Sequence, residues 1–164
     1  MEIDSNRITF RRATISDIEL IIEYRIIFLT EAQNNLTEEK SLVLRNSLRD
    51  YLVKSLADDT FISWIAEYDN LPVGFSGMVM REQPGNVEVP KGTTAYILNM
   101  FTISEFRKNG IASRLFSKLI EEARLRNADR IDLHATKEGE PIYRQFGFKE
   151  PHDKVLEFII TPGL

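Results

Sequence analysis

The stretch "FRKNGIASRLF", residues 106–116, places two basic residues before a glycine that leads into a helical pattern. The start of a helix leaves main-chain N–H groups without partners and carries a partial positive charge, so it can hold an anion. Gly110 has no side chain to keep a ligand away from the backbone, and Arg107 and Lys108 add positive charge. The pattern predicts a site for a polyphosphate, although a helix that merely starts at a glycine after basic surface residues has the same sequence.

Two common nucleotide-binding motifs are missing from the chain. There is no GxxxxGK[ST] stretch, so a P-loop is excluded, and no GxGxxG with a following acidic residue, so a dinucleotide site is not supported. A generic nucleotide-binding α/β domain therefore remains only a third choice among the functions considered below.

The length of 164 residues fits one domain with one core, and we expect a single domain over 1–164. The absence of cysteine excludes disulfides, a thiolate nucleophile and Cys-based zinc sites, and it suits a cytoplasmic protein. His134 and His152 are the only histidines, so no metal site is expected. No apolar run is long enough to cross a bilayer, and no membrane partner is expected.

The net charge of −4 comes from residues 16–59, which hold nine acidic against five basic residues. An acidic balance argues against nucleic acid as a partner, because that binding depends on Lys and Arg. The acids either attract a cationic ligand or are solvated faces of two helices, and the sequence leaves both readings open.

Apolar spacing and turn residues divide the chain into strands and helices. Thr14 or Ser16 is expected to cap the first helix, with Glu19 completing a capping box with Ser16, and Thr37 to open the second. We expect strands at 8–13, 61–68, 71–82, 94–103, 130–136 and 154–160, and helices at about 18–29, 37–56 and 110–126, with a short one within 138–148.

The order of these elements indicates an α/β fold with a mixed, mostly antiparallel central sheet and helices on both faces. The strand, helix and strand from 94 to 136 have the length of a βαβ crossover, so strands 94–103 and 130–136 should be parallel. The earlier strands are joined by hairpin-length links and should be antiparallel. Gly74 and Gly77 inside their strand indicate a bulge or a close backbone approach.

Three pieces of the chain, in order, resemble the GCN5-related N-acetyltransferase (GNAT) family: "YILNMFTISEFRKNGIASRLFSKLIEEA", "RIDLHAT" and "PIYRQFGF". The family signature [RQ]-x-x-G-x-[GA] is met by Arg107, Gly110 and Ala112, and a late tyrosine before a Gly-Phe pair is met by Tyr143. Residues 94–148 match closely, and the N-terminal half matches in element order.

The resemblance implies acetyl-CoA as the cosubstrate and no metal. Backbone amides from Arg107 to Ala112 would hold the pyrophosphate. The strand at 94–103 should splay from the strand at 130–136, and pantetheine would pair with the backbone near Phe101 and Thr102. The cofactor-binding residues implied are Phe101, Thr102, Arg107, Lys108, Asn109, Gly110, Ile111, Ala112 and Ser113.

The same resemblance implies direct transfer of an acetyl group to a primary amine of a small molecule or peptide. Tyr143 is expected to be the acid that protonates the leaving thiolate, and a packed aromatic is its alternative role. Relatives often carry a glutamate near the strand at 94–103, but this strand has no carboxylate here. Asn99 of this strand would either orient water or the acceptor, or only satisfy backbone groups. The base is left open between a water chain, Glu31 and bulk solvent.

A non-catalytic acyl-CoA-binding or regulatory module is the competing function, favoured by the missing carboxylate. The acceptor is expected to contact the links at 29–40 and 149–154, and the acids of the first link favour a cationic amine. The C-terminal strand would offer an edge for a possible homodimer.

Overall fold

The computed structural model describes residues 3–33 and 36–160. The chain divides into two compact units, Met1–His134 and Ala135–Leu164. Each unit is described here by itself, and the sheet and its helices all belong to the first.

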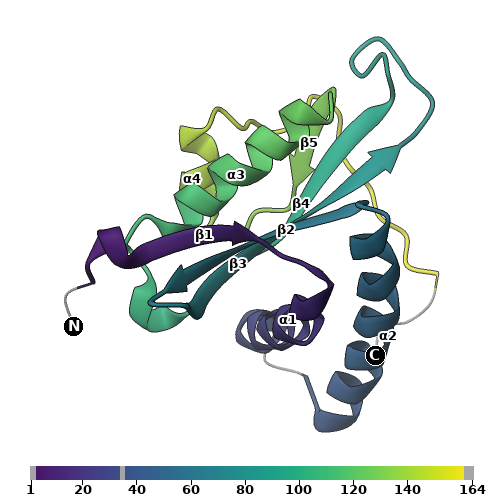
Figure 1. Cartoon of the computed structure of the whole chain (residues 1–164). Coiled ribbons are helices and arrows are strands. Elements are labelled where there is room, and N and C mark those ends of the chain that lie inside the picture. Colours follow the sequence, from purple (N-terminus) through teal and green to yellow (C-terminus); the bar gives the residue numbers. More distant parts are fainter. Residues whose placement is uncertain (1–2, 34–35, 161–164) are drawn as a thin grey trace. The chain divides into compact units, whose positions relative to one another are not determined.

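A single sheet of five strands in the order β1-β2-β3-β4-β5 forms the centre of the first unit (Figure 1). Neighbouring strands are antiparallel except for β4 and β5, which are parallel. The mixed sheet predicted from the sequence is therefore confirmed. The strands are β1 (Ile8–Arg12), β2 (Phe61–Tyr68), β3 (Leu71–Glu82), β4 (Thr93–Thr102) and β5 (Arg130–Leu133).

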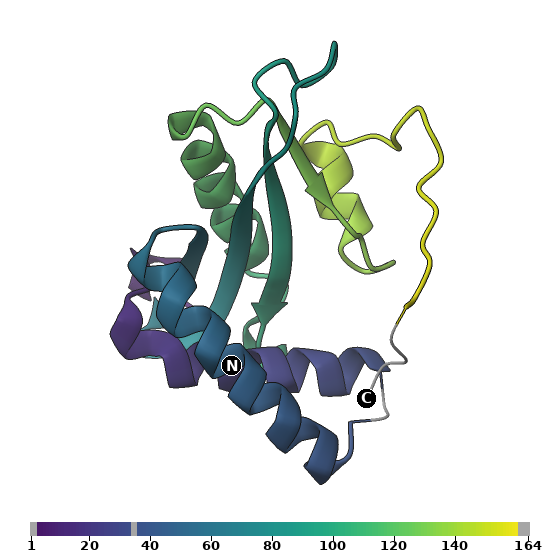
Figure 2. The same cartoon turned by 90° about the vertical axis from the view of Figure 1, so that its right-hand side faces the viewer.

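Helices cover both faces of this sheet, with α1 and α2 on one side and α3 on the other (Figures 1 and 2). Their bounds are α1 (Ile18–Gln33), α2 (Glu38–Ala57) and α3 (Ile111–Leu125), and short 3-10 turns lie at Ser5–Arg7, Ile15–Asp17 and Ser104–Phe106. Among the described helices, none combines the length and apolar character needed to cross a membrane.

The two faces of the sheet bury separate apolar clusters. Beneath α1 and α2, the rings of Tyr24, Phe75 and Phe101 pack with centroids 5.6 to 6.4 Å apart. On the other face, Ile111 and Leu115 of α3 pack against the sheet. Since β4 lies between the two clusters, its end is fixed from both sides.

The starts of α1 and α2 are stabilised by caps near the predicted positions. Thr37 caps α2, because its hydroxyl accepts a hydrogen bond of 3.3 Å from the Lys40 N–H. At the 3-10 turn Ile15–Asp17, which leads into α1, the main-chain N–H of Thr14 donates to Asp17 at 2.8 Å, so the capping box is Thr14 with Asp17 rather than Ser16 with Glu19. The guanidinium of Arg11 also bonds Asp17 and lowers the pKa of that carboxyl.

The second unit contains one described helix, α4 (Glu140–Gln145), followed by Gly147 at a φ of +89°. The strand predicted at 154–160 is wrong, because these residues are irregular and their apolar side chains are exposed. A strand-like composition reflects packing against neighbouring strands, and the described part of this unit offers no such partner.

Candidate functional site

The turn that precedes α3 has the geometry of an open anion site. Lys108 and Gly110 have φ values of +64° and +73°, in the left-handed region that glycine tolerates best. The side chain of Asn109 holds the turn by donating to the carbonyl groups of Phe106 at 3.1 Å and Arg107 at 3.0 Å. A Cβ atom at Gly110 would meet nothing within 4 Å. The space in front of the helix start is therefore free for a ligand.

The main-chain N–H groups of this turn are not all available. The N–H of Arg107 already donates to the Ser104 carbonyl at 3.2 Å. The first N–H groups of α3, those of Ile111, Ala112 and Ser113, lie at the helix terminus where intrahelical partners are lacking. The main-chain N–H groups that remain available for an anion are therefore those that follow Arg107.

The side chain of Arg107 is held in place by two acceptors. Its Nε donates to the carbonyl oxygen of Thr102 at 2.9 Å, and Nη2 donates to Glu31 Oε2 at 2.7 Å. The sequence indicated a positive charge here, and in the structure the guanidinium joins the end of β4 to the last turns of α1.

β4 extends beyond its pairing with β5. The parallel pairing ends at Ile97 with Leu133, whereas β4 continues to Thr102. The N–H of Ile103 donates to Val73 of β3 at 3.0 Å, so by alternation the N–H and C=O of Thr102 point to the opposite, open edge. The Thr102 hydroxyl is buried and has no hydrogen-bond partner among the described residues. This edge therefore offers the main-chain N–H of Thr102 to a ligand, while the carbonyl oxygen of Thr102 already accepts a hydrogen bond from Arg107.

A β-bulge bends β4 at the same place. Phe75 pairs with Phe101 and Gly77 with Leu98, so two residues of β4 face a single residue of β3. Asn99 lies in the bulge with a φ of +57°. The sequence indicated an irregularity through the glycines of β3. The extra residue is instead in β4, the strand that pairs with β3.

The glycines of β3 permit a close approach. A Cβ atom at Gly74 would lie 2.9 Å from the carbonyl oxygen of Phe101, and one at Gly77 would lie 2.8 Å from the ring of Phe61. The close backbone approach expected from these residues is confirmed at Gly74, whereas a side chain makes the close approach at Gly77. The glycine at position 74 thereby allows the end of β4 to lie flat against β3.

The amide of Asn99 binds a residue that sequence reasoning did not single out. Its Oδ1 accepts a hydrogen bond from Nη1 of Arg25, on α1. Burial lowers the pKa of this guanidinium. The signal was present in the sequence, since Arg25 stands at a position of the apolar helical run 18–29, where a charge is unexpected. The partner lies too far along the chain for that run to reveal it.

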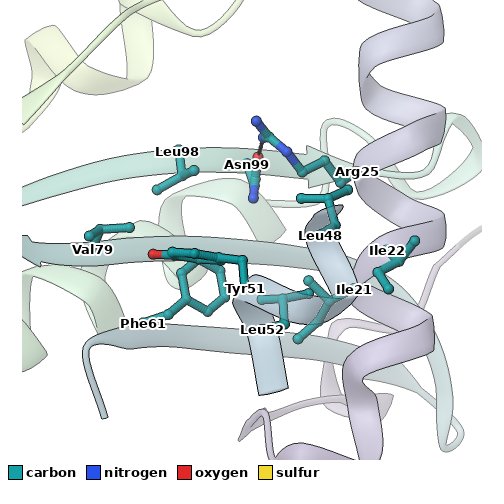
Figure 3. Close-up of a pocket in the computed structure, with 10 residues that line it drawn as sticks. All are labelled: Ile21, Ile22, Arg25, Leu48, Tyr51, Leu52, Phe61, Val79, Leu98 and Asn99. Atoms are coloured by element: carbon teal, nitrogen blue, oxygen red, sulfur yellow. Dashed lines mark hydrogen bonds between the residues drawn. The ribbon is translucent and has the colours of Figure 1, made fainter. Parts of the chain in front are cut away.

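Arg25 and Asn99 form one end of a pocket of about 180 Å³ (Figure 3). The pocket lies between α1, α2 and the sheet. Apart from these two polar residues, its walls are apolar or aromatic, among them Ile21, Leu48, Leu52, Phe61, Val79 and Leu98.

Five of the nine acidic residues in 16–59 form ion pairs. Arg49 binds Glu19 with distances of 2.7 and 2.8 Å, and Arg45 binds Glu23, with one distance of 3.0 Å. Both arginines lower the pKa of their partner carboxyl. These pairs join α1 to α2 on the surface, which favours the reading of solvated helix faces.

Tyr143 belongs to the second unit. It is buried there, and burial raises the pKa of its phenol. Its ring lies 6.4 Å from that of Phe148, and a Cβ atom at Gly139 would be 3.3 Å from its hydroxyl. A protonated phenol is the form that this environment favours.

The histidines do not gather with other metal ligands. His134 lies within 3.0 Å of the Tyr96 hydroxyl through Nδ1 and is exposed rather than interior. Across residues 3–33 and 36–160, no group of three or more His, Cys, Asp or Glu residues is placed to hold a metal ion.

Comparison with solved structures gives many similar chains, among them two that are more than 25% identical over nearly the whole chain. A predicted acetyltransferase from Clostridium acetobutylicum, crystallised with acetyl-CoA, is 29% identical, with a TM-score of 0.85 over 93% of this chain and 96% of that one. A GCN5-related N-acetyltransferase from Ralstonia eutropha JMP134 is 26% identical, with a TM-score of 0.81 over 92% and 98%.

More distant structures share the fold alone. An aminoglycoside acetyltransferase from an uncultured soil metagenomic sample, in complex with sisomicin, is 18% identical, with a TM-score of 0.67 over 96% of this chain and 97% of that one. Comparison with curated protein sequences gives no match.

The sequence model described as the acetyltransferase (GNAT) family matches residues 24–148. That span runs from α1 to the end of the turn after α4, and it contains the bulge at Asn99, the turn at Gly110 and Tyr143. The match covers most of the chain, and the open edge of β4 beside a bare helix start agrees with it. The chain belongs to the GNAT acetyltransferase family.

Proposed function

We propose that this protein transfers the acetyl group of acetyl-CoA directly to a primary amine of a small molecule or peptide. The observation that carries the proposal is the juxtaposition of an open helix start at Gly110 with a strand, β4, whose edge is unpaired beyond Ile97. The first feature suits a diphosphate, and the second suits an extended chain that contains amides.

The residues present fit acetyl-CoA. Main-chain N–H groups from Lys108 to Ser113 would bind the pyrophosphate, and a side chain at Gly110 would occupy the space that the phosphates need. The pantetheine arm would lie along the open edge of β4 at Phe101 and Thr102 and would pair there with main-chain groups of Thr102. Acetyl-CoA supplies an acetyl group activated as a thioester.

The transfer needs a neutral amine, because an ammonium has no lone pair. The amine nitrogen bonds to the acetyl carbonyl carbon, the carbon–sulfur bond breaks, and the amine proton leaves to a base. A main-chain N–H at the bulge of β4 stabilises the negative charge that develops on the carbonyl oxygen. The departing thiolate takes a proton from Tyr143, whose phenol has an ordinary pKa of about 10 against about 8.5 for a thiol.

The base is a water chain, Glu31 or bulk solvent. Asn99 cannot accept a proton, and its Oδ1 is occupied by Arg25, so its role is to position groups at the bulge. Glu31 is a carboxylate near the end of β4, but one of its oxygens accepts a hydrogen bond from Arg107.

A non-catalytic acyl-CoA-binding module is the alternative, and one observation favours it: β4 carries no carboxylate. Two measurements separate the functions. Calorimetry with CoA and with ATP tests whether the site takes coenzyme A, and release of free thiol from acetyl-CoA over a panel of amines tests turnover. CoA binding without thiol release from any amine would support the module, and the absence of CoA binding would contradict both functions.

A further inference from the structure

The pocket beneath α1 and α2 adjoins the edge of β4 along which the pantetheine arm is proposed to lie. Leu98 and Asn99 line the pocket, and they directly follow Ile97, the last residue of β4 that pairs with β5. An acceptor that fills this pocket therefore presents its amine at the bulge of β4. The chemistry of the pocket then selects the acceptor.

Arg25 is the only positive charge among the residues that line this pocket. Figure 3 shows its side chain extending from α1 to Asn99, whereas Leu52 and Phe61 lie toward the other end. The amide oxygen of Asn99 is neutral, and it is the only acceptor that Arg25 contacts in the described part of the chain. The other N–H donors of the guanidinium fork thus have no protein partner there.

The lack of a carboxylate beside Arg25 is unusual within this protein. Most other arginines pair with an acid, as Arg11 does with Asp17, Arg49 with Glu19 and Arg126 with Glu122. No described carboxylate forms an ion pair with Arg25, although burial lowers the pKa of this guanidinium, whereas the paired Arg49 is exposed. A charge that is partly removed from water and unpaired is unfavourable, and an anionic ligand would compensate for it.

The planar fork of a guanidinium matches a carboxylate, which it binds through two parallel hydrogen bonds. Because Arg25 bonds Asn99 at the bulge, such a carboxylate would lie close to the position of the reacting amine. An α-amino acid has its amine and its carboxylate on one carbon and meets this requirement. A long polyamine, which has no anionic group, does not.

The apolar walls define the rest of the acceptor. A cavity of about 150 Å³ holds a benzene molecule in a protein interior, and this pocket has about 180 Å³. A branched aliphatic side chain or a single ring fills such a space. Leu48 and Leu52 of α2, with Val79 of β3, would contact it.

We propose that the acceptor of this protein is a free α-amino acid with a compact apolar side chain, such as leucine, methionine or phenylalanine. Its carboxylate binds Arg25, its side chain fills the pocket of Figure 3, and its amine faces the bulge at Asn99. This inference rests on the acetyl transfer proposed above and names the substrate class for that same site.

The test compares L-leucine with L-leucinamide, which keeps the amine and the side chain but lacks the carboxylate. Thiol release from acetyl-CoA should give a kcat/KM for leucine that is about 10- to 100-fold higher, the loss expected for a charge-assisted hydrogen bond. Both values are calculated per concentration of neutral amine, because leucinamide is a weaker base than leucine. Glycine, which lacks the apolar side chain, should be a poor acceptor. This comparison uses the wild-type protein and depends on no variant.

The variant Arg25→Gln should raise the KM for leucine about 10- to 100-fold and leave that for leucinamide unchanged. Arg49→Gln removes an exposed arginine from α2 and should change neither value. Calorimetry of leucine binding to the CoA-saturated protein should show the same loss in Arg25→Gln. CoA should bind Arg25→Gln as tightly as it binds the wild type.

Equal turnover of leucine and leucinamide, or a higher kcat/KM for spermidine than for leucine, would overturn the amino-acid assignment while leaving the acetyl transfer intact. An equal loss for both leucine compounds in Arg25→Gln would assign Arg25 a purely structural role and would also overturn it. Failure of the wild type to bind CoA would instead contradict the proposed function itself.

Discussion

The turn at 106–113 and the pocket beneath α1 and α2 both lie against β4, yet they are made from different parts of the chain. The turn consists of main-chain groups from a few consecutive residues, with Gly110 as the feature that keeps it open. The pocket consists of side chains from two helices and three strands, and its one charge comes from Arg25. A site made of backbone needs particular residues at fixed spacing. A site made of side chains needs only that the fold bring them together.

The first prediction tests the backbone-made part and has the largest expected effect. Gly110→Val should weaken CoA binding more than 100-fold, because the side chain enters the ligand space and a branched residue is strained at a φ of +73°. Calorimetry measures the affinity.

The matched control is Asn127→Val at the other end of α3, where φ is +53°. It should cost about 1–2 kcal/mol of stability through the same backbone strain and leave CoA affinity unchanged. CoA binding retained in Gly110→Val would contradict the turn as the diphosphate site.

The second prediction concerns a step that a side chain carries. Tyr143→Phe should lower kcat about 100-fold, since general acid catalysis contributes about that much, with the Kd for CoA unchanged. Burial raises the pKa of this phenol, so the wild-type rate should be retained at neutral pH and fall only as the pH rises through that elevated value. Steady-state kinetics over pH checks both points, and an unaltered kcat in Tyr143→Phe would remove the acid role.

The third prediction links the two regions through their common strand. Gly74→Ala would place a Cβ atom 2.9 Å from the Phe101 carbonyl oxygen and 3.3 Å from Ile111 and Thr102 side-chain atoms. Overpacking of this kind costs about 1–3 kcal/mol. Thermal unfolding should show that loss, and CoA affinity should fall with it because the end of β4 shifts. If stability falls while affinity holds, the strand end does not form part of the CoA site.

The fourth prediction has the smallest effect on binding and also decides the base. Glu31→Gln removes a negative charge beside Arg107 in an exposed pair, so CoA affinity should rise only about two- to threefold at low ionic strength and not at high salt. A fall in affinity would show that Glu31 orients Arg107 for binding. A kcat about 100-fold lower would identify Glu31 as the base, and an unchanged kcat would leave water or solvent.

Local patterns predicted much of the fold and the backbone-made region. The strands at 61–68 and 71–82 were located correctly, as was the cap at Thr37, because these elements depend on neighbouring residues. Gly110 predicted the turn before α3 for the same reason. The residues of the turn are consecutive, so a single stretch of sequence displays all of them.

The remaining features depend on residues far apart. The bond between Arg25 and Asn99 joins positions that are 74 residues apart, and no local pattern records it. The bulge at Asn99 needs the pairing of β3 with β4 to be known. The prediction of a strand at 154–160 was wrong because the composition of this segment suits a strand, but a strand also requires a neighbouring strand.

The exposed apolar residues of 155–160 also affect how the protein behaves in concentrated solution. Val155, Leu156 and Phe158 are each at least 70% accessible to water. Exposed apolar segments favour association between molecules, so we expect the protein to self-associate as its concentration rises. Enzyme assays therefore belong at high dilution, and storage buffers need additives that keep the copies dispersed.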